Sequence, residues 1–206
     1  HFDAATASYG DSPTPTNMSN FNHSLRVVAE IVRRHKHAPA VWGVEPVNEP
    51  WQFLPVEWVK KFYWEGYWIT RRAAPHWVYM MHDSFRGYPA AWWDFMKGCK
   101  NKAMDTHIYQ AWNRPGIAKT FLDNACNAAG GLKTMEELVD MPMVVGEWSL
   151  ATDNCAMWLN GFNDNLPGYP KVACDMVPCA EPYMGAEQPG CPRDKEAPLQ
   201  GPDGTG

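Results

Sequence analysis

The sequence lacks a long hydrophobic run, an excess of positive charge and any internal repeat. No stretch of about 18 consecutive apolar residues occurs, so we expect no membrane-spanning helix. The 18 Lys and Arg residues are outnumbered by 23 Asp and Glu residues, and the resulting net charge of −5 argues against nucleic acid as a partner. A chain of 206 residues is nevertheless long enough for one domain with a sizeable core.

Cysteine pairs of the Cys-x-x-Cys type are also absent, although the chain has six cysteines. Zinc sites prefer such close pairs, so the spacing argues against zinc. Four of the six cysteines lie after residue 150, in a stretch rich in proline and glycine. An even number of cysteines in an irregular segment favours disulfide bonds and an oxidising compartment, with reduced thiols as the alternative.

Hydrophobic periodicity predicts helices and strands that alternate along the first 150 residues. Helices are predicted over about 24–35 (with Ser24 as N-cap), 56–74 and 115–130 (closed by Gly130-Gly131), followed by a helical turn at 134–137. Strands are predicted over about 41–47, 77–81, 103–109 and 143–145, and irregular chain over 1–20 and 86–100. This alternation indicates a parallel sheet with helical crossovers.

Every predicted strand ends in a polar cluster, and active sites of parallel α/β folds collect at these strand ends. The clusters are Asn48-Glu49, His82-Asp83-Ser84, Asp105 to Tyr109, and Glu147-Trp148. Glu49 and Glu147 are about 98 residues apart, or about 33 for each of three strand-to-strand steps, which matches a strand-helix-strand unit. In a closed eight-stranded barrel such positions face each other, and two facing carboxyl groups suit cleavage of a glycosidic bond.

Three segments resemble, in order, the motifs of glycoside hydrolase family five, a family of retaining (β/α)8 hydrolases. VWGVEPVNEPW resembles the Asn-Glu-Pro signature of strand four, DTHIYQ the strand-six motif, and MVVGEWSL the strand-seven segment. HFDAATASYG and GEWSLATDNC are most similar to the fungal-type exo-β-1,3-glucanases (glucan 1,3-β-glucosidases) of that family. The resemblance covers about residues 1–165.

The resemblance implies catalytic roles for two of these residues and a substrate contact for a third. Glu49 corresponds to the general acid/base, and Glu147 corresponds to the nucleophile. Asn48 would donate a hydrogen bond to the sugar 2-hydroxyl, a contact that strengthens in the transition state.

Four further residues are implied to bind substrate or to support the carboxyl groups. Tyr109 would hold the nucleophile, and His107 would contact the sugar or a carboxylate. Trp51 and Trp148, which follow the two motif glutamates, would shape the pocket. The chain has 11 tryptophans, whose rings fill cores by default but can also stack on sugars.

The fold class that the resemblance implies is α/β, as a partial (β/α)8 barrel with a long irregular Cys- and Pro-rich C-terminal tail. The matched motifs correspond to strands four to seven, so the chain would begin after strand three and end before strand eight. A complete barrel needs about 250 residues. We therefore expect residues 1–152 to form part of a glycoside hydrolase catalytic domain and residues 153–206 to form an irregular loop or tail of the same domain.

The implied function is retaining hydrolysis of a β-glucan by double displacement, as in a glucan exo-1,3-β-glucosidase, without metal or cofactor. The same residues fit a β-1,4-glucanase or a mannanase, because loops set the linkage. An alternative of another class is a non-catalytic β-glucan-binding remnant, which the missing strands favour. We also expect a monomer that is secreted to the extracellular space or cell wall.

Overall fold

The computed structural model describes residues 2–3, 8–9, 17–110, 113 and 117–149. The chain forms two compact units, of which the first holds residues 1–107 and 131–146 and the second holds the remainder. The predicted tail at 153–206 and four of the six cysteines lie outside the described residues, and Cys99 and Cys126 have free thiols. No helix in the described part of the chain combines the length and apolar character that crossing a bilayer requires.

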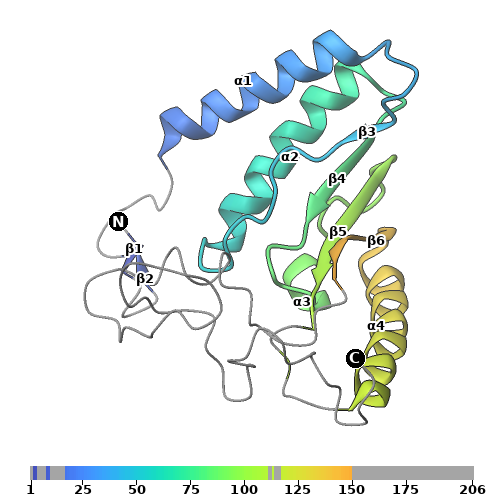
Figure 1. Cartoon of the computed structure of the whole chain (residues 1–206). Helices are drawn as coiled ribbons and strands as arrows, with labels where there is room; N and C mark the ends of the chain where they lie inside the picture. The colour runs from blue at the N-terminus through green and yellow to red at the C-terminus, as the bar shows by residue number, and fades with distance from the viewer. Residues whose placement is uncertain (1, 4–7, 10–16, 111–112, 114–116, 150–206) are drawn as a thin grey trace, which may run out of the picture. The chain divides into compact units, whose positions relative to one another are not determined.

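A four-stranded sheet carries the strand ends of interest (Figure 1). Its strands stand in the order β3 (Gly43–Val44), β4 (Val78–His82), β5 (Lys102–Ile108) and β6 (Met143–Trp148). β3, β4 and β5 run parallel, with Gly43 opposite Val78 and His82 opposite Asp105. Strands adjacent in sequence are therefore adjacent in the sheet, as strand-helix-strand crossovers require.

Four helices and one small hairpin complete the described chain. The helices are α1 (Met18–His35), α2 (Val56–Ala73), α3 (Pro89–Trp92) and α4 (Ala118–Val139). The short strands β1 (Phe2–Asp3) and β2 (Ser8–Tyr9) pair antiparallel. The predictions for α2, β4 and β5 are confirmed to within one residue at each end.

Three of the differences from the predicted boundaries have local reasons. α1 begins at Met18 rather than Ser24, because the side chain of Asn17 accepts hydrogen bonds from the N–H groups of the first turn. The strand predicted at 41–47 shrinks to two residues, since Pro46 has no N–H to donate to a sheet. Gly130-Gly131 does not end a helix, because α4 continues through both at a cost of about 1 kcal/mol each relative to Ala.

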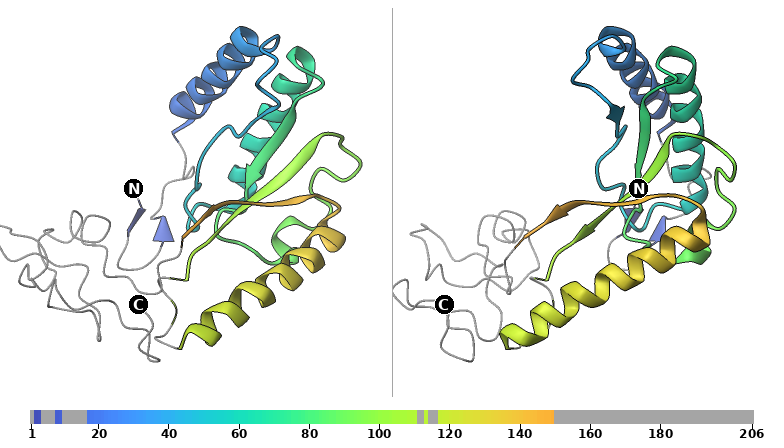
Figure 2. Two further views of the ribbon diagram at one scale, coloured as in Figure 1. Left: turned by 45° about the vertical axis from the view of Figure 1, so that its right-hand side comes forward. Right: turned by 90° about the vertical axis from the view of Figure 1, so that its right-hand side faces the viewer.

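The helix pair α1 and α2 packs through a regular apolar stripe. Phe21, Leu25, Val28 and Val32 recur every three or four residues and are the buried residues of α1. The ring of Phe21 meets that of Phe62 on α2 edge-on, with 5.3 Å between centroids. Figures 1 and 2 show the two helices lying side by side.

The main core lies between α2 and β4. Tyr63 and Tyr67 from α2 are buried against Tyr79 and Met81 from β4. A Cβ atom at residue 66 would overlap the Tyr79 hydroxyl, so only glycine at that position lets the helix approach the strand this closely. Each buried aromatic side chain contributes about 1.5–3 kcal/mol, and this core fixes the strand from which the polar cluster projects.

Candidate active site

The loop after β3 carries Glu49 in an unusual backbone conformation. Its φ of 41° lies in the left-handed region, which is uncommon for a residue other than glycine. The side chain is 35% exposed, so its carboxyl group reaches solvent. Strained residues of this kind cluster at functional sites.

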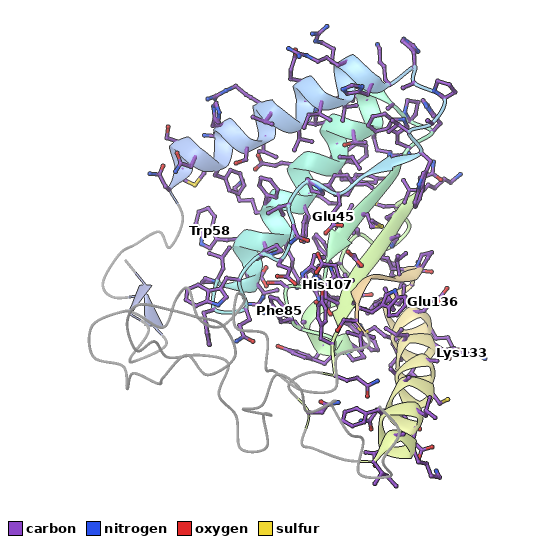
Figure 3. The ribbon with its side chains drawn as sticks, viewed as in Figure 1. Glu45, Trp58, Phe85, His107, Lys133 and Glu136 are labelled. Carbon is purple, nitrogen blue, oxygen red and sulfur yellow. The ribbon has the colours of Figure 1, made fainter. Side chains whose placement is uncertain are left out.

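The Glu49 carboxyl group is held by His107, which lies at the carboxyl end of β5 (Figure 3). His107 Nδ1 lies 2.5 Å from Glu49 Oε1, and His107 Nε2 lies 3.2 Å from Asp105 Oδ2. The side chains of His107 and Asp105 are each only 2% exposed. A half-exposed acid is thus connected to a buried imidazole and, through it, to a buried carboxylate.

Asp105 also binds the backbone of the next strand. Its Oδ1 accepts a hydrogen bond of 2.6 Å from the N–H of Gly146, one peptide bond before Glu147. A Cβ atom at residue 146 would lie 2.7 Å from Cγ of Asp105 and closer still to both carboxylate oxygens. Glycine is therefore required for this approach.

The loop that follows Glu49 is fastened by two side chains from beyond β4. The Ser84 hydroxyl donates a 2.6 Å hydrogen bond to the carbonyl of Pro50. The buried guanidinium of Arg86 donates to the carbonyls of Gln52 (2.5 Å) and Leu54, and to Ser84. These bonds use backbone acceptors on the short segment that carries the acid, so they restrict where Glu49 can point.

His82, at the end of β4, is buried beside His107, with 4.3 Å between ring centroids. Burial lowers the pKa of His82, although the charge of Asp83 acts in the opposite direction. The ring is therefore kept neutral. Its Nδ1 accepts a 2.9 Å hydrogen bond from the Ser84 N–H, so the single ring proton lies on Nε2.

Glu49, His82 and His107 each offer one potential metal-ligand atom, and these atoms lie within 4.8 Å of one another. A metal ion needs a free lone pair on each ring nitrogen that binds it. The Ser84 N–H occupies the lone pair of His82 Nδ1, and the ring proton occupies Nε2. The hydrogen bonding of His82 therefore argues against metal binding by Glu49, His82 and His107.

In the second unit, Tyr109 and Glu147 form a pair of their own. The Tyr109 hydroxyl donates a 2.6 Å hydrogen bond to Glu147 Oε2. Trp148, the next residue, is 65% exposed. The structure therefore joins Tyr109 to Glu147 and leaves the Trp148 side chain largely exposed.

The remaining predicted residues lie on the loop after β3. Asn48 is exposed. Trp51 is 48% exposed, and its ring meets that of Phe53 edge-on at 5.1 Å between centroids. Both side chains are accessible to a ligand.

Sequence reasoning did not assign a role to Asp105, Ser84 or Arg86. A signal for Asp105 was present, because Asp105, His107 and Tyr109 alternate along β5 and its end, and side chains two apart share one face of a strand. No comparable signal exists for Ser84 and Arg86, whose partners lie more than thirty residues away.

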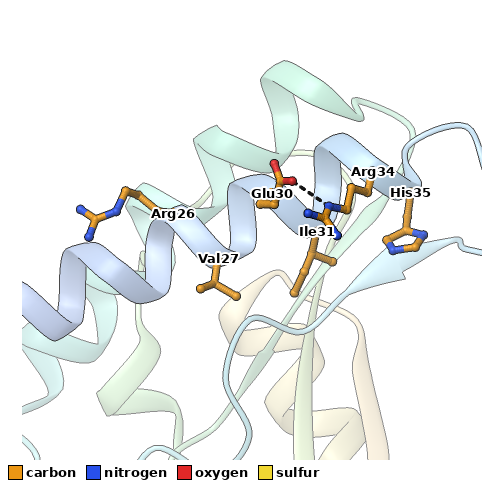
Figure 4. Close-up of a pocket in the computed structure, with 6 residues that line it drawn as sticks. All are labelled: Arg26, Val27, Glu30, Ile31, Arg34 and His35. Carbon is orange, nitrogen blue, oxygen red and sulfur yellow. Dashed lines mark hydrogen bonds and ion pairs between the residues drawn. The ribbon is translucent and has the colours of Figure 1, made fainter.

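A separate hollow of about 370 Å³ runs along α1 and is lined by Arg26, Val27, Glu30, Ile31, Arg34 and His35 (Figure 4). Hydrogen bonds from Arg33 and Arg34, each 2.7 Å long, lower the pKa of Glu30 to about 2. All the lining residues belong to one helix, away from the strand ends. This hollow has the character of an ion-paired helix surface.

The chain matches no family model. It is 29% identical over 190 residues to the glucan 1,3-beta-glucosidase of Blumeria graminis, covering 85% of this chain and 43% of that protein. It is 32% identical over 148 residues to the probable glucan 1,3-beta-glucosidase A of Aspergillus niger, covering 69% of this chain and 34% of that protein. The chain thus spans about two fifths or less of the length of these curated relatives.

Among solved structures, the endoglucanase Cel5A of Thermotoga maritima superposes with a TM-score of 0.54 at 17% identity, over 64% of this chain and 48% of that one. The same enzyme in complex with mannotriose gives a TM-score of 0.52 at 15% identity, over 63% of this chain and 48% of that one. At this identity the likeness concerns the fold. Sequence and fold together confirm the resemblance to glycoside hydrolase family five, and the chain is a partial (β/α)8 barrel similar in sequence to the glucan 1,3-beta-glucosidases.

Proposed function

We propose that the chain carries the catalytic strand ends of a retaining β-glycoside hydrolase that acts on β-1,3-glucan. One observation carries this proposal, namely the hydrogen bond of 2.5 Å between the half-exposed Glu49 and the buried His107. Such a bond places a proton between the imidazole and the carboxyl group of a side chain that solvent can reach. A general acid in glycoside hydrolysis needs both features.

In the proposed mechanism the two motif glutamates act in turn. Glu147 attacks the anomeric carbon while Glu49 protonates the departing sugar oxygen, and a glycosyl-enzyme ester forms. Glu49 then takes a proton from water, which attacks the anomeric carbon and releases Glu147. This chemistry requires the two carboxyl groups to be about 5–5.5 Å apart.

The hydrogen bonding of Glu147 supports its role as nucleophile. The Tyr109 hydroxyl donates to Oε2, and this hydrogen bond holds the carboxyl group in place for attack. Glu49 has an imidazole partner with which it can share a proton, whereas the Tyr109 hydroxyl gives Glu147 a donor only.

The substrate assignment rests on the relatives called glucan 1,3-beta-glucosidases. A β-glucan would bind across the loop after β3, where Asn48 can reach a sugar hydroxyl and the accessible ring of Trp51 can stack on a sugar. We further propose that residues 1–152 belong to one catalytic domain, that 153–206 are its tail, and that the protein acts as a secreted monomer at the cell wall or outside the cell.

A second candidate function is β-glucan binding without cleavage. The observation that favours it is the exposure of Trp51 and Trp148, which are 48% and 65% exposed and whose rings can stack on sugars. The two functions differ in their need for Glu49 and Glu147, because a binding protein does not depend on either carboxyl group.

Release of glucose from laminarin by the 206-residue chain tests the proposal. We expect Glu147→Gln and Glu49→Gln each to lower the rate by at least about a thousandfold. Glu57→Gln, which changes an exposed acid on α2, is the matched control and should leave the rate unchanged.

An aryl β-glucoside with a good leaving group separates the two roles, because it needs no protonation to depart. Glu49→Gln should still release the aryl group in a burst, while Glu147→Gln should not. Binding of laminarin with no hydrolysis by the unchanged chain would favour the second function and contradict the first.

A further inference from the structure

The two oxygens of the buried Asp105 carboxylate face two different donors. Oδ1 accepts the N–H of Gly146 at 2.6 Å, and Oδ2 lies 3.2 Å from Nε2 of His107. A carboxylate buried to this extent is stable only when hydrogen bonds replace its hydration. Both contacts are satisfied when Asp105 is ionised and His107 carries a proton on Nε2.

This arrangement decides where the second proton of the network lies. With Nε2 protonated, the other nitrogen of a neutral His107 ring is an acceptor. The 2.5 Å hydrogen bond between Nδ1 and Glu49 Oε1 must then take its proton from the Glu49 side, or share it between the two atoms. In the opposite tautomer Nδ1 would donate, and Glu49 would have to be ionised.

We propose that Asp105 is a positioning residue that fixes the tautomer of His107 and thereby keeps a transferable proton at Glu49. The inference rests on the proposed function only in taking Glu49 as the general acid. Asp105 touches neither the reacting atoms nor solvent and acts through the imidazole ring. This assigns a role to the first residue of the Asp-x-His-x-Tyr spacing.

Gly146 belongs to the same device. Because Gly146 has no side chain, the Asp105 carboxylate fits beside it. The Gly146 N–H donates a hydrogen bond to Oδ1 of that carboxylate. Asp105 therefore fixes the backbone one peptide bond before Glu147 as well as the imidazole beside Glu49.

Asp105→Asn tests the tautomer directly, because an amide offers one acceptor and one donor. The oxygen of the new side-chain amide keeps the hydrogen bond from the Gly146 N–H. The NH2 group of that amide then faces His107 Nε2. The ring must then place its proton on Nδ1. We expect long-range ¹H–¹⁵N spectra of the labelled 206-residue chain to show Nε2 protonated in the unchanged protein and Nδ1 protonated in Asp105→Asn, with His107→Gln used to assign the signals.

Asp83→Asn is the matched control. Asp83 is also a buried strand-end carboxylate with two donors, the Phe85 N–H and the Thr106 hydroxyl, but it does not bond to His107. It should lower stability to a similar extent and leave the His107 tautomer unchanged. If Asp105→Asn fails to fold, Gly146→Ala displaces the carboxylate instead and should also remove the Nε2-protonated form.

The tautomer is measured without substrate, so it is independent of the proposed function. An unchanged His107 spectrum in a folded Asp105→Asn or Gly146→Ala chain would overturn the inference. Loss of the proton from His107 Nε2 in Asp83→Asn would also overturn the inference, because any buried carboxylate would then have the effect assigned to Asp105. In hydrolysis, Asp105→Asn should lower kcat on laminarin about tenfold to a hundredfold and affect KM and the aryl glucoside burst little.

Discussion

The two motif glutamates sit in contrasting surroundings. Glu49 is connected through a buried imidazole to a buried carboxylate, and its loop is fastened by Ser84 and Arg86. Glu147 has the hydroxyl of Tyr109 as its partner and is followed by an exposed tryptophan. One carboxyl group thus has an imidazole partner, and the other has a phenol partner.

The contrast follows from the burial of the surrounding residues. The side chains of His107 and Asp105, which support Glu49, are each only 2% exposed. The residues of β6, which carries Glu147, alternate between half-buried and exposed along its second half. Burial makes hydrogen bonds on the Glu49 side stronger and more costly to break.

The largest effect is expected from Arg86→Ala, which releases the loop after Glu49. Its loss leaves the carbonyls of Gln52 and Leu54 without their donor, so the free energy of unfolding should fall by about 2–3 kcal/mol. Urea unfolding measures this change, with the exposed Arg72→Ala as control. An equal loss in both variants would mean that the guanidinium does not fasten the loop.

Tyr109→Phe tests the other side of the comparison. It removes the donor to Glu147, so hydrolysis should slow by about tenfold to a hundredfold while the free energy of unfolding changes by less than about 1 kcal/mol. Rates on laminarin and thermal melts together check the expectation. A large loss of stability with unchanged activity would show that Tyr109 is a packing residue only.

His82 should make the stability of the chain depend on pH. Burial lowers its folded pKa below the ordinary value of 6.5, with Asp83 opposing and His107 adding to this shift. The unfolded chain therefore binds the proton first, and stability should fall as the pH drops below 6.5, by at most about 1.4 kcal/mol per pH unit. Well above 6.5, as at pH 8, the residue contributes almost no slope.

His82→Gln should flatten that slope between pH 6.5 and pH 5 without changing it at pH 8. Urea unfolding at several pH values measures the difference between the two chains. A slope that is identical with and without His82 would assign the acid sensitivity to another group.

The smallest effect is expected from two tyrosines in the core between α2 and β4. The Tyr63 hydroxyl donates 2.9 Å to the carbonyl of His82, whereas the buried Tyr79 hydroxyl has no hydrogen-bond partner among the described residues. Tyr63→Phe should therefore cost about 1 kcal/mol, and Tyr79→Phe should cost nothing or stabilise slightly. Comparing the two melting temperatures checks this, and a reversed order would contradict it.

The sequence predicted the elements whose signals are local. The apolar stripe of α2 and the apolar runs of β4 and β5 each lie within one segment, and so do the motifs with Glu49, His107 and Tyr109. The contact of Asp105 with Gly146 spans 41 residues and depends on the register of two strands, which no local pattern specifies. The start of α1 was missed because one capping side chain, Asn17, outweighs the apolar periodicity.

The left-handed backbone of Glu49 has a consequence for protein engineering. A glycine adopts φ near 41° without the clash that a Cβ atom brings, which amounts to about 1 kcal/mol in favour of Glu49→Gly. The same substitution removes the 2.5 Å hydrogen bond to the buried His107, which costs about 1–3 kcal/mol and offsets that gain. Selection for resistance to heat alone therefore does not favour glycine at this position.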